Sequence, residues 1–302
     1  MDKSAKKRKF FQRKWSALEI CVCLILTVYS LALIVLFAWA IMTSFKTQGA
    51  YDRDKLFFNT PNAFTFDNYL NVFNGMSSQV PTLEGGMRPV YIEEMFLYSF
   101  LYAGGCAFCQ TFFTATVAYC TARYKGTVAS VIHSIVIVTL ILPVVGSLAS
   151  TLQMAYELNL VNNMLGMYVL KVSFNNMYYL IFYALFASMS WEYAESAFID
   201  GASHFTVYFK IMFPLAATLF GTVFLLFFIS YWNDYQVPLM FLRNMPTLAL
   251  GLYGFMLHDH SEFATPTAKI AAGVCVFIPV FAVFVAFRNK IMGNLTEGGI
   301  KG

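Results

Sequence analysis

Long apolar runs separated by short polar segments dominate the chain. A transmembrane helix needs about 20 mostly apolar residues, because each residue advances about 1.5 Å through a hydrocarbon layer about 30 Å thick. Six runs reach or approach this length, and the fourth could start as early as Met164. The pattern therefore predicts an all-α membrane protein with six transmembrane helices, at residues 17–44, 96–122, 128–154, 174–191, 212–232 and 270–287.

Composition agrees with this prediction. Hydrophobic residues make up 59% of the 302 residues and charged residues only 12%, whereas soluble domains carry about 25% charge. The basic residues before position 17 look like the start of a signal peptide, but the apolar run after them is too long for one, so we expect a retained first helix. The net charge of +4 gives no reason to expect a nucleic-acid partner.

The Lys and Arg residues predict the orientation, because cytoplasmic loops are enriched in them. With the N-terminus inside, thirteen of the 20 basic residues face the cytoplasm and seven face outward. We therefore expect both termini to be cytoplasmic. The chain would consist of a basic tail at 1–16, a transmembrane domain at 17–287 with an external segment at about 45–95, and a C-terminal tail at 288–302.

Several kinds of chemistry find little support. The predicted spans contain almost no ionisable side chain except His133, which we expect to be an interfacial or packing residue. This argues against an ion-coupled secondary carrier. The sequence has no GxxxxGK[ST] phosphate loop and no nucleophile–base set, which argues against an ATPase and a membrane enzyme. The six cysteines lie in apolar runs, and His258-Asp259-His260 lies in a predicted loop, so we expect no metal site.

An amphipathic segment at 191–214 separates the predicted fourth and fifth spans. Its pattern predicts a short helix with Glu192 and Glu195 in its first turn, a reversal at Gly201, and a second helix that enters the fifth span at Pro214. The first helix has an apolar stripe that something must cover. From the pattern alone, the membrane surface and a soluble partner are equally open. The stripe consists of Ala194, Ala197 and Phe198.

The same segment resembles a known family motif. Glu195-Ser196-Ala197, then Gly201 after three residues and Ile211-x-Phe213-Pro214 after nine more, is similar to the EAA motif, Glu-Ala-Ala-x3-Gly-x9-Ile-x-Leu-Pro. That motif is the signature of permease subunits of binding-protein-dependent ABC importers. Ser196 and Phe213 depart from it conservatively, and Asp200-Gly201-Ala202 has the form common in the carbohydrate-uptake branch.

The resemblance extends over nearly the whole chain. Ser44-Phe45-Lys46-Thr47, Asn68-Tyr69, Trp232-Asn233-Asp234-Tyr235 and the C-terminal residues 294–302 are similar to segments of the same branch. In type, the chain resembles the smaller permease subunits of maltose importers. The resemblance implies the ABC type I importer permease fold with a cytoplasmic coupling helix, in a bacterial plasma membrane.

The resemblance also implies partners. The chain would pair with a second homologous permease subunit above two ATP-binding subunits, surrounded by membrane lipid. ATP and Mg would bind to those subunits, with no cofactor in this chain, and an extracellular solute-binding protein would dock near residues 234–267. The implied ATPase contacts are Glu192, Glu195, Ser196, Ala197, Asp200, Gly201, Ala202, Phe205 and Pro214, with Gly298, Gly299 and Lys301 in the tail.

The solute implied by the resemblance is a sugar, and specifically an oligosaccharide. A non-sugar solute such as an amino acid, phosphate or a polyamine is the alternative within the same fold, and a secondary carrier is the alternative outside it. Sugars bind amide groups, hydroxyl groups and aromatic faces, but such groups also join helices in membranes. The polar side chains that could contact a sugar, or could instead join helices, are Gln110, Ser147, Asn175 and Asn176.

Overall fold

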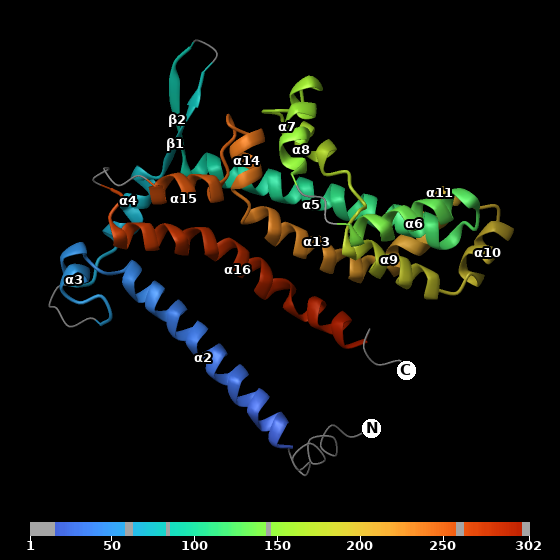
Figure 1. Cartoon of the computed structure of the whole chain (residues 1–302), viewed down its shortest axis with the longest axis horizontal. Helices are drawn as coiled ribbons and strands as arrows, with labels where there is room; N and C mark the ends of the chain where they lie inside the picture. Colours follow the sequence, from blue (N-terminus) through green and yellow to red (C-terminus); the bar gives the residue numbers. More distant parts are fainter. Residues whose placement is uncertain (1–15, 58–62, 83–84, 143–145, 258–262, 298–302) are drawn as a thin grey trace.

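A computed structural model of the chain describes residues 16–57, 63–82, 85–142, 146–257 and 263–297. The fold is mostly helical, as predicted, with one β-hairpin. The long helix α5 (Ile92–Arg123) is central and packs against α13 (Ala217–Trp232) and α9 (Met177–Ser188). Figure 1 shows α2 (Ala17–Ser44) and α16 (Pro266–Glu297) running obliquely away from one end of this group.

Within the described residues, α2, α5 and the Pro266–Phe287 part of α16 are long and apolar enough to cross a membrane. The first predicted span is confirmed at its predicted bounds, and the second begins earlier than predicted, at Ile92. The sixth begins at Pro266 and its helix continues to Glu297, past the predicted boundary at 287.

The third and fourth predicted spans are interrupted rather than continuous. The third is divided into α6 (Thr127–Ile141) and α7 (Ser147–Glu157), and Gly146 between them has φ of 83°, which a right-handed helix cannot contain. The fourth, predicted at 174–191, contains only α9. With the alternative start at Met164 it also contains α8 (Met164–Leu170), which a non-helical link at 171–176 separates from α9. With 15 and 12 residues, α6 and α9 are shorter than the roughly 20 that a straight crossing needs.

The fifth predicted span begins later than the sequence indicated. Its helix α13 starts at Ala217, and the residues before it, His204–Leu215, form a separate rod that meets α13 at 74°. The rod consists of α11 (His204–Val207), the π-helix η1 (Tyr208–Met212) and α12 (Phe213–Leu215). Pro214 therefore lies inside the rod, near its end, and the bend falls at Ala216.

The predicted external segment at about 45–95 forms regular secondary structure. It contains two short helices and an antiparallel hairpin in which Val80 pairs with Arg88. We call the end of α5 that lies beside this hairpin the hairpin end, and the opposite end, at Arg123, the loop end (Figure 1). The remaining elements are α3 (Gln48–Arg53), α4 (Asp67–Gly75), β1 (Ser77–Pro81), β2 (Met87–Tyr91), α10 (Glu192–Ile199), α14 (Gln236–Phe241) and α15 (Leu248–Leu257).

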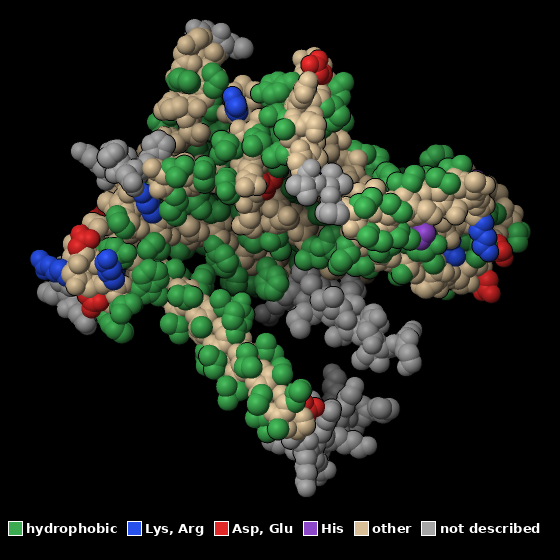
Figure 2. Space-filling model, in the orientation of Figure 1, with side chains coloured by type: hydrophobic (Ala, Val, Ile, Leu, Met, Phe, Trp, Pro, Cys, Tyr) green, Lys and Arg blue, Asp and Glu red, His purple; other side chains and the backbone are tan. Residues whose placement is uncertain are grey.

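Apolar side chains point outward on every side of α2. Ser16 caps this helix and forms a reciprocal capping box with Glu19, and Phe37 packs on Phe277 of α16 with ring centroids 4.9 Å apart. Figure 2 shows hydrophobic side chains covering α2, whereas charged side chains gather around α3 and α10. A helix that is apolar all round belongs in lipid or in a buried interface, so α2 fits a membrane environment.

Buried side chains form two clusters along α5. The cluster at the hairpin end includes Tyr102 and Trp232, and the cluster at the loop end includes Tyr119, Phe186 and Tyr208. Because α5 contributes to both, it is one continuous element that joins the two ends of the molecule.

Asn68 fastens α2, α4 and α16 together at the hairpin end. This side chain is 4% exposed, and its amide nitrogen donates to the carbonyls of Ser44 at 2.8 Å and Lys46 at 2.7 Å. Its amide oxygen accepts from the Thr267 hydroxyl at 3.0 Å. Both amide hydrogens of Asn68 and its amide oxygen therefore have partners inside the protein.

We expect Asn68→Ala to lower the free energy of unfolding by roughly 3 kcal/mol, because it leaves the carbonyls of Ser44 and Lys46 without this buried donor. Thermal unfolding of the detergent-purified protein measures the effect. Asn74→Ala is the matched control, since Asn74 lies exposed on the same helix. Equal melting temperatures for the two variants would contradict this role of Asn68.

Candidate functional site

The helix α10 begins at Glu192 and ends at Ile199, which confirms the predicted short helix with Glu192 and Glu195 in its first turn. It ends in a Schellman motif: the Gly201 N–H donates to the Phe198 carbonyl at 3.0 Å, and the Ala202 N–H donates to the Ala197 carbonyl at 2.9 Å. Gly201 has φ of 82°, a left-handed conformation that glycine adopts at little cost. This geometry reverses the chain between α10 and α11.

The rod after the reversal begins with a capped turn. The Ser203 hydroxyl accepts from the Thr206 N–H at 3.3 Å, which satisfies one of the free N–H groups at the start of α11. The π-helix η1 follows, and the Tyr208 hydroxyl within it lies 2.8 Å from the Thr116 hydroxyl of α5. The rod is thus fixed to the central helix before the chain bends into α13.

A second set of contacts anchors α10 to the loop end of α5. The Arg123 guanidinium lies over the Trp191 ring at 5.3 Å, and it donates to the Met189 carbonyl. The Tyr124 hydroxyl lies 2.9 Å from Nδ1 of His204, whose ring packs on Phe198 with centroids 4.8 Å apart. Side chains in direct contact therefore join α10 and α11 to the loop end of α5.

The apolar stripe of α10 faces the protein itself. Ala194 is fully buried, and Ala197 and Phe198 pack against the loop-end cluster. Neither the membrane surface nor a partner is needed to cover this stripe.

A different face of the loop is exposed, and it carries both acidic and apolar side chains. Ile199 is 86% exposed and Phe205 is 78% exposed. Most of the coupling residues predicted from the sequence are exposed too, whereas Ala197 and Ala202 are half-buried. We call the exposed set Glu192, Tyr193, Glu195, Ser196, Ile199 and Phe205 the loop face.

Three of the four candidate sugar contacts gather beside the middle of α5. Gln110 accepts a hydrogen bond from the Tyr231 hydroxyl of α13. The Asn176 amide donates to the Thr114 hydroxyl at 2.8 Å, and Asn175 accepts from the Thr139 hydroxyl at 2.8 Å. We call this set the polar band: Gln110, Thr114, Thr139, Asn175, Asn176 and Tyr231.

The fourth candidate, Ser147, does not join the polar band in the described residues. It is exposed at the start of α7, and its carbonyl accepts from the hydroxyls of Ser150 and Thr151. These are local contacts within one helix turn.

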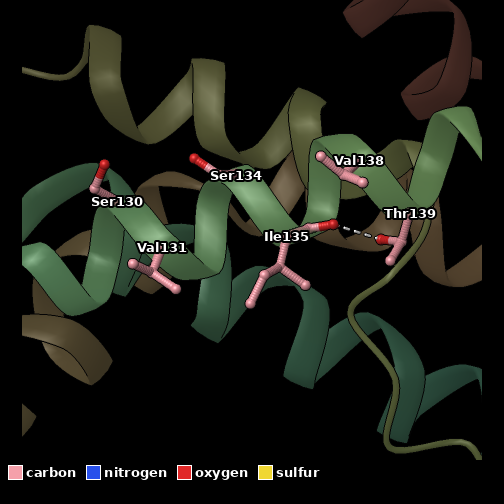
Figure 3. Close-up of a pocket in the computed structure, with 6 residues that line it drawn as sticks. All are labelled: Ser130, Val131, Ser134, Ile135, Val138 and Thr139. Atoms are coloured by element: carbon pink, nitrogen blue, oxygen red, sulfur yellow. Dashed lines mark hydrogen bonds between the residues drawn. The ribbon is translucent and has the colours of Figure 1, made fainter.

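An open groove of about 310 Å³ runs along α6 and ends at the polar band. Figure 3 shows the hydroxyl groups of Ser130, Ser134 and Thr139 along this helix, with Thr139 bonded to the Ile135 carbonyl. The same Thr139 hydroxyl donates to Asn175. The uncovered face of α6 therefore leads to the non-helical link between α8 and α9.

The polar band lies near the middle of the membrane-spanning length of α5. Thr114 precedes Arg123 by nine residues and is therefore about 14 Å from the loop end, and Gln110 is about 20 Å from it. The link at 171–176 lies at this depth, since the Ser173 carbonyl accepts from Thr114 at 3.1 Å. Transporters bind substrates where helices are interrupted near the midplane, because free backbone and polar groups meet there.

The fold also brings ionisable side chains to this region that were not assigned to a site from the sequence. Lys171, at the start of the link, has its ammonium group 5.0 Å from the centre of the Tyr231 ring. The Asp234 carboxylate accepts from the Tyr102 hydroxyl at 3.0 Å. Both residues follow helix ends rather than lying within apolar runs. The polar run Lys171-Val-Ser-Phe-Asn-Asn between two apolar helices was the signal available in the sequence.

The other candidate residues have structural surroundings or lie outside the described residues. His133 stacks on Tyr183 at 4.2 Å and lies 3.1 Å from the Tyr179 hydroxyl, which agrees with a packing role. No cluster of three or more His, Cys, Asp or Glu that could hold a metal occurs within the described ranges. Gly298, Gly299 and Lys301, and the loop at 258–262, fall outside the described residues.

In sequence, this chain resembles permease proteins of known transport systems. The chain is 26% identical over 245 residues to the arabinooligosaccharides transport system permease protein AraQ of Bacillus subtilis, covering 80% of this chain and 81% of AraQ. It is 27% identical over 270 residues to the sulfoquinovosyl glycerol transport system permease protein SmoH of Agrobacterium fabrum, covering 87% of each.

A solved structure is similar in fold. A bacterial ABC transporter involved in the import of the acidic polysaccharide alginate contains a chain that matches with a TM-score of 0.76 and 19% identity, over 92% of this chain and 99% of that one. Residues 111–291 also match a family described as the binding-protein-dependent transport system inner membrane component. That match spans more than half of the chain and includes the loop face and all of the polar band except Gln110, so this protein belongs to the family of binding-protein-dependent transport system inner membrane components.

Proposed function

We propose that the chain is the permease subunit of an ATP-driven ABC importer that moves a saccharide, specifically an oligosaccharide, into a bacterial cell. Family membership supports a membrane transport component that works with a solute-binding protein and an ATPase. The relatives support the saccharide, since AraQ is named for arabinooligosaccharides and SmoH for a sulfoquinovosyl glycerol.

The observation that carries the proposal is the bare loop face on a firmly anchored reversal. The side chains of Ile199 and Phe205 are exposed, although the stripe on the opposite side of α10 is buried. Exposed apolar groups ringed by charge are typical of protein interfaces. We infer that this face docks on an ATP-binding subunit and that nucleotide-driven movement passes through Arg123 and Tyr208 into α5.

The full assembly would contain a second homologous permease subunit and two ATP-binding subunits, with both termini of this chain in the cytoplasm. ATP and Mg would bind to the ATPase subunits. The hairpin end would then face outward toward the solute-binding protein. The polar band would line the sugar path, and Gln110, Asn175 and Asn176 would contact sugar hydroxyls as the two permeases rock about their interface.

Reconstitution of the complete importer in proteoliposomes tests this function. We expect uptake of a labelled oligosaccharide only with ATP inside the vesicles and the solute-binding protein outside, with uptake at background when either is omitted. Uptake that continues without the ATPase subunits would instead indicate a secondary carrier. If the solute-binding protein binds an amino acid, phosphate or a polyamine and no saccharide, the importer carries that solute instead of a sugar.

A further inference from the structure

The Lys171 side chain is placed unusually for a membrane protein. It is half-buried beside α5, and its ammonium group lies over the face of the Tyr231 ring. The Tyr231 hydroxyl bonds Gln110, about 20 Å along α5 from the loop end. The lysine therefore borders the polar band within the bilayer, where an ionisable side chain is costly and usually functional.

The nearby carboxylate of Asp234 already accepts two hydrogen bonds. One oxygen of Asp234 accepts from the Tyr102 hydroxyl at 3.0 Å, and the other accepts from the Val237 N–H at 3.1 Å. No carboxylate of the described residues lies within 4.0 Å of the Lys171 ammonium nitrogen, unlike the exposed pair of Arg88 and Glu94. The Lys171 ammonium group thus lies over an aromatic ring, whereas both oxygens of the Asp234 carboxylate already accept hydrogen bonds from other groups.

The groups around this lysine suit a saccharide. Tyr231 contributes an aromatic face and a hydroxyl, Gln110 an amide, and Asn176 an amide on the adjoining link. A cation beside such groups complements a sugar that carries a negative charge, because a charge-assisted hydrogen bond is about twice as strong as a neutral one.

We propose that Lys171, with Tyr231 and Gln110, forms a subsite for the anionic group of an acidic saccharide. This inference rests on the proposed import function and adds that the transported saccharide carries a negative charge. A neutral oligosaccharide would leave the ammonium group without an ionic partner along the path.

A purely structural role for Lys171 predicts different results. The residue follows the last residue of α8, where a cation is favourable for the helix dipole. In that case, its replacement would reduce the amount of folded protein and would not change the apparent affinity for the cargo.

The first test uses the cognate solute-binding protein with a panel of uronate and sulfated disaccharides and the neutral disaccharides of the same sugars and linkages. We expect binding of acidic members. Binding of neutral members only would overturn the inference and leave the import function intact. Binding of no saccharide, with binding of another solute class, would instead overturn the import of sugar.

The second test measures uptake of the bound acidic disaccharide by cells carrying the complete importer. Lys171→Met should raise KM at least tenfold, since a lost hydrogen bond to a charged group costs about 10–100-fold in affinity, and Lys171→Arg should restore most of it. Lys55→Met is the matched control, because Lys55 also lies over a tyrosine ring, 6.0 Å from the centre of Tyr51, but is exposed near α3.

Two results of the uptake experiment would overturn the subsite. One is an unchanged KM in Lys171→Met at normal protein levels. The other is a fall in protein level in both Lys171→Met and Lys171→Arg with KM unchanged in the protein that remains, which would show that the lysine only supports the end of α8.

Discussion

Replacing Ile199 by Asp should abolish solute uptake while leaving the chain folded in the membrane. Its side chain is 86% exposed at the end of α10, so the change removes no packing inside this protein. On the loop face, however, it places a charge where we propose that an ATPase subunit docks. The loss of one central apolar contact in an interface typically costs about 2 kcal/mol or more, and an unpaired buried charge adds to that cost.

Two measurements check this expectation. Affinity purification of the complex should recover at least about 30-fold less ATPase subunit with Ile199→Asp, and uptake should fall to background. Ile199→Leu is the matched control, because it keeps an apolar group of the same size and should retain both activities. Normal uptake in Ile199→Asp would show that the loop face does not dock the motor.

The second large effect is expected at Gly201. Its φ of 82° closes the Schellman motif between α10 and α11, and an added Cβ would meet no atom within 4 Å. Space is therefore not the obstacle, but a β-branched residue is strained in the left-handed conformation by more than about 1–2 kcal/mol. Gly201→Val should change the direction of α10 relative to α11 and reduce uptake more than tenfold.

The controls for Gly201→Val separate strain from other causes. Gly201→Asn should retain most activity, because asparagine tolerates the left-handed region. Gly221→Ala in α13 also adds a Cβ into open space, but at an ordinary helical position, and should be neutral. The readout is the stimulation of ATP hydrolysis by the loaded solute-binding protein. Full stimulation in Gly201→Val would contradict a requirement for this turn.

The loop was predictable because its signals are local. Gly201 needs only its own backbone and four neighbours to end α10, and Ser203 needs only the next turn to cap α11. Such contacts span few residues, so residue order alone specifies them. Which face of α10 stays bare was not local, because Ala194 and Phe198 belong to a cluster that also contains Tyr119 of α5, more than 70 positions away.

The polar band, in contrast, depends on contacts between residues that are far apart in the sequence. Gln110, Asn175 and Asn176 stood out as polar groups in apolar surroundings. Lys171, however, looked like an ordinary residue after a helix end, and Asp234 stood out only as part of a segment that resembles the family. Their positions beside Tyr231 and Tyr102 arise from contacts across 60 and 132 residues. No pattern with a helical period contains such pairings.

The sequence by itself determined that the chain is a helical membrane protein with an α10–α11 reversal, because hydrophobic length, glycine conformation and capping act over a few turns. Only the tertiary structure decided where the third and fourth spans are interrupted side by side, which face of the loop remains exposed, and which charges reach membrane depth. These features depend on how α5 packs against distant segments, and packing between segments far apart in the chain leaves no periodic signal in either of them.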